Sequence, residues 1–129
     1  NKALVYALNV IKKRSVFILI SDFIDDNYDK NLKALANKHD LVVIHLSDRR
    51  EAKLPRLGII PVFDKEARKT IWINTSSPEF RRNISQKFTL NRNQLEDICK
   101  KSNSSYLQIF TTEDYVSKLI KLFQVRNVK

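Results

Sequence analysis

Three short apolar runs constrain the fold of this chain more than any other feature of its sequence. They cover residues 15–21, 41–46 and 105–110, and each has the length of a typical strand and is apolar at most positions. Strands that are apolar on both sides occur mainly in parallel sheets, because helices cover both faces of such sheets. Between the runs, apolar residues recur at helical spacing. This alternation predicts an α/β sandwich with a mainly parallel sheet.

The segments around these runs carry the signals of helices. Ser77, Pro78 and Glu79 form a strong helix start, because serine caps, proline fits the first turn and glutamate favours the positive helix end. Thr112 is in position to cap a last helix. We expect helices over residues 3–13 and 27–38, from Ser77 onward, in a second short piece after Asn93, and from Thr112 onward.

The middle of the chain breaks the alternation. Residues 47–57 are charged and irregular and predict a loop, and residues 59–64 and 70–74 predict an antiparallel hairpin attached to the sheet. Three parallel strands make a small sheet, and no strand precedes the first helix. We therefore expect residues 1–129 to form a single domain that is the carboxyl-terminal part of a larger domain. Its incomplete sheet would leave an exposed edge strand through which copies of the chain can pair.

The composition excludes several classes of protein. Gly58 is the only glycine, whereas Walker and GxGxxG loops need several glycines to bring backbone close to a phosphate. One cysteine, Cys99, and two histidines, His39 and His45, are too few for a Cys/His structural zinc site or for a disulfide scaffold. We interpret Cys99 and His45 as core residues and place His39 at the amino side of the sheet. No apolar run reaches the roughly 20 residues of a membrane helix.

The chain is strongly basic, with 24 Lys and Arg against 14 Asp and Glu and a net charge of +10. This charge raises nucleic acid or anionic lipid as a partner. The basic residues are scattered, most phenylalanines fall at positions expected to be buried, and the segment from Asp22 to Asp29 is acidic. We therefore expect a basic surface that is solvated or faces a protein partner, and keep nucleic-acid binding as an alternative.

Polar side chains follow each of the three predicted parallel strands. Ser21, Asp22, Asp25 and Asp26 follow the first, Ser47 and Asp48 the second, and Thr111 and Thr112 the third. Ligands of open α/β sheets bind beyond the carboxyl ends of the strands, and hard oxygen donors suit Mg²⁺. The alternative is that these residues only form turns and helix caps. A Ser-His-Asp hydrolase is not expected, because no glycine-flanked nucleophile turn is present.

The chain resembles the carboxyl half of the bacterial family called domain of unknown function 58. The residues that carry the resemblance are the run 14–23 followed by Asp25, the run 38–44, Asp48 with Glu51 and Leu54-Pro55, and the ending with Thr111-Thr112, Leu122-Phe123 and Arg126. That family is von Willebrand factor A-like, which implies a Rossmann-like three-layer sandwich with a metal-ion-dependent adhesion site at the carboxyl rim. In such a site, an Asp after the fourth strand holds the cation through water, and Asp22 matches this position. The Asp-x-Ser-x-Ser motif of the site is absent from this chain.

The resemblance implies a function at the bacterial membrane. Members of the family are typically accompanied by MoxR-type ATPases and often carry upstream membrane segments. We therefore expect a non-enzymatic protein-interaction module, a cytoplasmic domain of a membrane-anchored protein that assembles or regulates membrane-associated proteins. Asp22 and Asp25 are the predicted metal residues, with Mg²⁺ or Mn²⁺ bound in the full-length protein and not tightly in this chain. The alternative is a Mg-dependent receiver-like or phosphoesterase-like enzyme that uses Asp22, Asp25 and Asp48.

Overall fold

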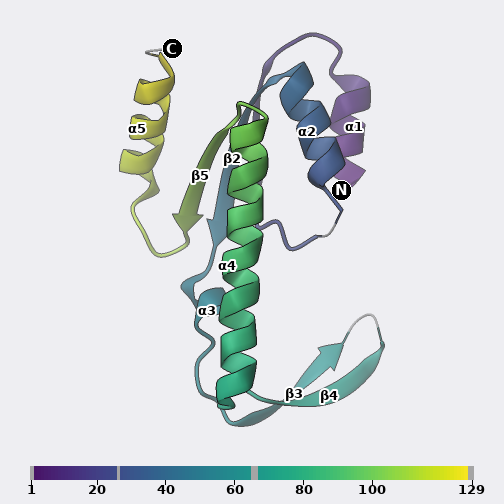
Figure 1. Cartoon of the computed structure of the whole chain (residues 1–129), viewed down its shortest axis with the longest axis vertical. Coiled ribbons are helices and arrows are strands. Elements are labelled where there is room, and N and C mark those ends of the chain that lie inside the picture. The colour runs from purple at the N-terminus through teal and green to yellow at the C-terminus, as the bar shows by residue number, and fades with distance from the viewer. Residues whose placement is uncertain (1, 26, 65–66, 128–129) are drawn as a thin grey trace. The chain divides into compact units, whose positions relative to one another are not determined.

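The computed structural model describes residues 2–25, 27–64 and 67–127 of the chain (Figure 1). The chain groups into two compact units, the first formed by Asn1–Ser47 and Asn93–Lys129 and the second by Asp48–Arg92. One long helix, α4 (Pro78–Lys101), contributes residues to both units. That residues 1–129 act as a single domain stays a prediction.

The first unit is built on a sheet of three parallel strands, β1 (Val16–Ser21), β2 (Asp40–Ser47) and β5 (Ser105–Phe110). Their order is β1-β2-β5, so β2 lies in the middle. Val42 of β2 is level with Ile18 on one side and with Ser105 on the other. All three predicted strands are confirmed, with β2 one residue longer at each end than the apolar run.

Helices cover both faces of this sheet. α1 (Lys2–Val10), α2 (Asp29–Lys38) and the last turns of α4 pack on one face, in a buried cluster that contains Val43. α5 (Tyr115–Asn127) packs on the other face, against a group that contains Ile44. Figure 1 shows α5 and the α1–α2 pair on opposite sides of the sheet. The predicted α/β architecture with a mainly parallel sheet is therefore confirmed in this unit.

Two long basic side chains tie the helices of the first unit in place. The Arg126 guanidinium donates to the Asp40 carboxylate and to the Ser105 hydroxyl, which fixes the end of α5 to the amino ends of β2 and β5. Lys38 Nζ at the end of α2 donates to the Leu8 carbonyl of α1 at 2.7 Å. Charge-assisted hydrogen bonds of this kind are stronger than neutral ones, so they set the positions of the helix ends.

β1 forms one edge of the sheet. In the described part of the chain its strand neighbour is β2 alone. Phe17 and Leu19 pack inward against the helical core, whereas Val16, Ile18 and Ile20 alternate with them and are exposed. The exposed edge strand expected from the sequence is therefore present, and pairing between copies stays a prediction.

The second unit combines a hairpin with the first turns of α4. It contains α3 (Arg49–Ala52) and the antiparallel strands β3 (Ile59–Asp64) and β4 (Lys69–Asn74). Thr75 closes the base of the hairpin. Its buried hydroxyl donates to the Gly58 carbonyl at 2.8 Å and accepts the Leu57 N–H at 3.0 Å. Gly58 has a φ of +73°, a backbone conformation that favours glycine.

Three expectations for the middle of the chain are wrong. The hairpin is not attached to the parallel sheet but forms its own two-stranded sheet. Residues 47–57 are not entirely loop, because Asp48 caps the short α3 by accepting the Arg50 N–H at 2.8 Å. The two helices expected around Asn93 are one helix of 24 residues, since no glycine or proline interrupts residues 79–101 and asparagine alone is only mildly unfavourable in a helix.

The start of the last helix also differs from expectation. Asp114, and not Thr112, caps α5, since its carboxylate accepts the Val116 N–H at 3.0 Å and the Ser117 hydroxyl at 2.7 Å. These hydrogen bonds favour the ionised carboxylate and lower the Asp114 pKa.

Among the helices of the described chain, none combines the length and apolar character needed to cross a membrane.

The end of α4 gives a prediction for stability. Asn103 has a φ of 52°, and the Ser104 N–H donates to the Cys99 carbonyl at 2.9 Å, as in a Schellman cap. Replacing Asn103 by Ala places a Cβ without local polar support in the left-handed region and should cost about 1 kcal/mol of unfolding free energy. Asn103→Gly should match or exceed the wild type in urea unfolding. Equal losses in both variants would contradict this explanation.

Candidate functional site at the carboxyl rim of the sheet

The loop after β1 is pinned by local hydrogen bonds and by one aromatic ring. Ser21 Oγ accepts the Phe23 N–H at 3.1 Å, and Asp22 Oδ1 accepts the Ile24 N–H at 3.4 Å. Phe23 has a φ of 53°, in the left-handed region, and its ring is buried. The chain therefore turns sharply at this point, with Phe23 directed inward and the Asp22 side chain exposed to solvent.

His45 supports this loop from inside the sheet. Its ring is buried, with 3 % of the residue exposed, and it meets the Phe23 ring edge-on at a centroid distance of 5.6 Å. Nδ1 lies 3.0 Å from the Tyr106 hydroxyl, and the ring also hydrogen-bonds to the backbone of Asp22. Burial lowers the pKa of His45, while the backbone hydrogen bond and the charge of Asp22 oppose the shift. The imidazole is therefore neutral at pH 7 and links the Asp22 loop to β5.

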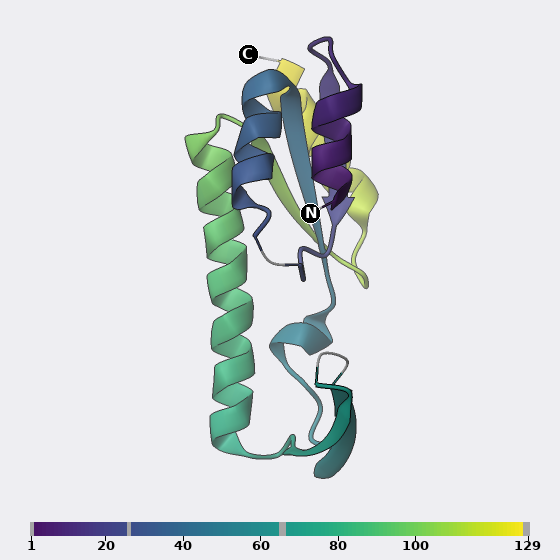
Figure 2. The same cartoon turned by 90° about the vertical axis from the view of Figure 1, so that its right-hand side faces the viewer.

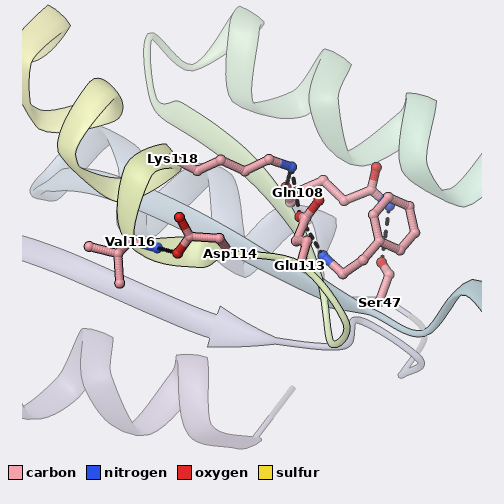
Figure 3. Close-up of polar contacts among 7 residues, drawn as sticks. Ser47, Gln108, Glu113, Asp114, Val116 and Lys118 are labelled. Carbon is pink, nitrogen blue, oxygen red and sulfur yellow. Dashed lines mark hydrogen bonds and ion pairs between the residues drawn. The ribbon is translucent and has the colours of Figure 1, made fainter.

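A second pair of polar side chains joins β2 and β5 in the same way, two residues further along the strands. Gln108 Nε2 donates to Ser47 Oγ at 3.0 Å (Figure 3). The register places His45 level with Gln108 and Ser47 level with Phe110. Each polar residue of β2 therefore bonds to the β5 residue two positions before its register partner. This diagonal arrangement satisfies two buried polar side chains of the central strand.

The turn after β5 closes the rim of the first unit. Lys118 Nζ lies 2.6 Å from Glu113 Oε1 and donates to the Gln108 carbonyl, and the Phe110 N–H donates to the same Glu113 oxygen at 2.7 Å (Figure 3). The Thr111 N–H donates to the Ser47 carbonyl at 3.0 Å. The backbone hydrogen bond of Thr111 thus joins the ends of β5 and β2, while Lys118 and Glu113 hold the turn against β5.

The structure places the predicted rim residues in different settings. Asp22 and Asp25 are exposed in the loop after β1, and Asp26 lies outside the described residues. Ser47 is buried and bonded to Gln108, and Thr111 and Thr112 are exposed. Asp48 belongs to the second unit, where it caps α3.

The described residues do not fit a complete metal site at this rim. Over residues 2–25, 27–64 and 67–127, no group of three or more His, Cys, Asp or Glu side chains could hold a metal ion. Asp22 and Asp25 alone supply fewer oxygen ligands than Mg²⁺ or Mn²⁺ takes. Their role as metal residues stays a prediction, and no step of the function proposed below depends on a cation.

The other two chemically versatile residues lie in the core. Cys99 is buried, and burial together with the charge of Glu96 raises its pKa to about 11, so its thiol stays protonated at neutral pH. His39 follows α2, is buried, and lies 6.1 Å from the Phe17 ring. Among the described residues its ring nitrogens have no hydrogen-bond partner. The placement of Cys99 and His45 in the core and of His39 at the amino side of the sheet is confirmed.

Sequence reasoning missed the supporting side chains of the rim. It did not single out Phe23, Tyr106 or Gln108, because aromatic and amide residues in these positions are common in any core. The available signal was the buried β2 run itself, since His45 and Ser47 lie on one face of it and need polar partners.

The sequence identifies the family of this chain. Residues 1–94 match the family described as "Protein of unknown function DUF58", and the chain belongs to that family. It is also similar to an uncharacterized protein of Mycobacterium avium, with 22 % identity over 116 residues that make up 89 % of this chain and 68 % of that protein.

Longer relatives are known as well. An uncharacterized protein of Mycobacterium tuberculosis is 22 % identical over 116 residues, and the match covers 89 % of this chain but 36 % of that protein. The crystal structure of an "Uncharacterized Membrane Spanning Protein" from Vibrio fischeri aligns with 98 % of this chain and 50 % of that chain, at 12 % identity and a TM-score of 0.33. The chain thus spans about a third to two thirds of the length of its relatives.

The link between His45 and Tyr106 predicts a loss of stability. Tyr106→Phe leaves the buried Nδ1 without its hydroxyl partner, which should lower the unfolding free energy by about 1 to 2 kcal/mol. Tyr6→Phe is the control, because Tyr6 is exposed. Urea unfolding of the three proteins measures the difference, and equal stability of wild type and Tyr106→Phe would contradict the role assigned to this hydrogen bond.

The lowered pKa of His45 predicts how stability depends on pH. The unfolded chain takes up a proton at this residue near pH 6.5, whereas the folded chain does so only at lower pH. The contribution of neutral His45 to the free energy of unfolding is therefore complete above pH 6.5. It declines as the pH falls from there toward the pKa of His45 in the folded chain. NMR titration of the His45 ring should give a midpoint below 6.5. His45→Gln should lose less unfolding free energy between pH 7.5 and 5.5 than the wild type loses.

Proposed function

We propose that this chain is a non-enzymatic protein-interaction module of a von Willebrand factor A-like protein. Its partner is another protein, a MoxR-type ATPase, and the pair acts in the assembly or regulation of membrane-associated proteins. The observation that carries the proposal is β1, which among the described residues forms an edge of the sheet with an exposed apolar face and is followed directly by the exposed Asp22.

The edge of β1 is suited to receive a strand from a partner. In the described residues, β2 is the strand neighbour of β1, so the other edge of β1 offers backbone N–H and C=O groups that another strand can satisfy, a mode of recognition called β-augmentation. Val16, Ile18 and Ile20 remain exposed beside this edge, with between 47 % and 61 % of each residue accessible to solvent. Covering them would contribute hydrophobic free energy in addition to the backbone hydrogen bonds.

Asp22 adds a charged anchor at the end of the same strand. Its loop is held by Ser21, Phe23 and His45, so the carboxylate is presented with little freedom to lose on binding. A fixed exposed carboxylate recognises a lysine or arginine of a partner, and such a pair improves specificity and the rate of association.

The von Willebrand factor A-like assignment is supported by the resemblance and by the order of elements. The sheet is parallel, helices cover both of its faces, and Asp22 follows a strand of the sheet directly. The proposal assigns Asp22 to partner binding and assigns no catalytic residue.

The proposal is tested by binding of the chain to the MoxR-type ATPase encoded by the same genome. Ile18→Lys places a charge on the open edge and should weaken binding by about tenfold or more. Asp22→Asn removes the anchor charge and should weaken binding to a smaller extent, mainly through a slower association rate. Surface plasmon resonance on the wild type and both variants measures affinity and rates.

Two matched variants serve as controls. Val10→Lys changes an exposed apolar residue of α1, and Asp97→Asn changes an exposed acid of α4 that pairs with Lys101. Both should bind as the wild type does. Unchanged affinity in Ile18→Lys and Asp22→Asn, or Mg²⁺-dependent phosphoryl turnover by this chain that is lost with Asp22, would overturn the proposal.

A further inference from the structure

The hairpin of the second unit exposes one complete face. Residues directly opposite each other in an antiparallel pair share a face, and here Ile59, Pro61 and Phe63 of β3 lie opposite Asn74, Trp72 and Thr70 of β4. All six are exposed, and Ile59, Phe63 and Trp72 have 65 %, 60 % and 71 % of their surface accessible to solvent. Figure 2 shows the hairpin as a curved ribbon that begins and ends at the same side of the unit.

This face is apolar and aromatic. Ile59, Pro61, Phe63 and Trp72 make up four of its six positions, and Leu57, which is also exposed, precedes the first strand. The opposite face is more protected, because Ile60, Val62 and Ile73 are half-buried and Ile71 is 36 % exposed. Large apolar side chains gathered on an exposed surface generally mark a site that another surface covers.

Basic residues lie at the ends of the hairpin strands. The segment 48–92 contains eleven Lys and Arg against five Asp and Glu, so its net charge is +6. This is more than half of the net charge of +10 of the whole chain. Arg56 and Arg68 are exposed in the segments that precede β3 and β4, and Lys69 is the exposed first residue of β4. The surface that covers the hairpin must therefore accept an apolar aromatic face and carry negative charge.

We propose that the exposed face of the β3–β4 hairpin binds the interface of an anionic lipid bilayer. Tryptophan and phenylalanine favour the boundary between headgroups and acyl chains, and isoleucine contributes apolar area that enters the bilayer. Arginine and lysine side chains beside them reach the anionic headgroups, each contributing about 1 kcal/mol near the surface. The first unit then presents its own binding surface to a protein partner while the second unit contacts the membrane.

The character of the face favours lipid over nucleic acid. Single-stranded nucleic acid is bound by aromatic rings that stack on bases inside a basic groove. On this hairpin the aromatic rings are interleaved with Ile59 and Pro61, which offer neither a stacking surface nor hydrogen bonds. The basic residues lie at the ends of the strands and not along the face, as in a segment that inserts apolar side chains between charged anchors.

Trp72 provides a direct test, because it is the only tryptophan in the chain. The whole chain is mixed with vesicles of phosphatidylcholine alone or of phosphatidylcholine with 30 mol % phosphatidylglycerol. Insertion should shift the emission of Trp72 to shorter wavelength with the anionic vesicles and not with the neutral ones. Vesicle flotation measures the partition coefficient, which should fall steeply as salt is raised.

Matched variants separate insertion from simple charge attraction. Phe63→Ser should lower the partition coefficient about tenfold, because the serine contributes no apolar area. Leu90→Ser is the control, since Leu90 is 68 % exposed on α4 in the same unit and lies outside the hairpin. Arg68→Gln with Lys69→Gln should weaken binding to anionic vesicles as well, which keeps the test valid if Phe63→Ser reduces the stability of the hairpin.

Other results would overturn the proposal. Binding without a shift of Trp72 emission would mean attraction of charges at the surface and no insertion. A shift caused by an oligonucleotide and not by vesicles would assign the face to nucleic acid. Dimers that bury Trp72 in the absence of lipid, detected by sedimentation and fluorescence, would assign it to a second copy. These readouts do not involve the MoxR-type ATPase, so they are independent of the function proposed for the first unit.

Discussion

The first unit depends on the burial of β2 on both of its faces. Leu41 and Val43 contact the core under α1, α2 and α4, while Val42 and Ile44 contact the core under α5. Five consecutive residues, from Leu41 to His45, are buried. A strand in this position holds both helical layers to one sheet, and any loss of side-chain volume leaves a cavity that neighbours on two sides cannot fill. β1 and β5 are placed by their pairing with this strand.

The burial of β2 also explains the arrangement of side chains at the carboxyl rim of the sheet. β2 continues into the core as far as Ser47, so His45 and Ser47 enter it as polar side chains. A buried polar group without a partner is costly, and the register with β5 supplies Tyr106 and Gln108 at equivalent diagonal positions. His45 also bonds to the Asp22 backbone. The side chain that gains hydrogen-bond partners in the core therefore also holds the exposed Asp22 loop in position. The exposed surface at the end of β1 is therefore shaped by the packing of the central strand.

Most of the sheet could be predicted, because apolar runs of strand length leave few alternatives. The hairpin strands were also predictable, but their separation from the parallel sheet was not, since hydrophobic patterns do not identify strand partners. The continuity of α4 was missed because apolar spacing weakens around Asn93, although no helix breaker is present there. At α5, both Thr112 and Asp114 are able to cap, and only the path of the turn after β5 decides in favour of Asp114. For the site, the sequence located Asp22 and placed His45 in the core, but hydrophobic patterns do not show that His45 and Phe23 support the Asp22 loop.

The second unit is stabilised differently and therefore leaves different surfaces open. A two-stranded sheet buries little area and is marginal by itself in water, so the hairpin needs contacts beyond its own strand pairing. At its base, Thr75 makes hydrogen bonds with Leu57 and Gly58, and one face is half-buried. On the other face, Phe63 and Trp72 gain nothing from folding while they remain in water. A bilayer interface would cover this exposed face. The free energy gained by burying Phe63 and Trp72 would then favour both membrane binding and the folded hairpin. The apolar side chains retained on this face then stabilise the unit at the place where it binds.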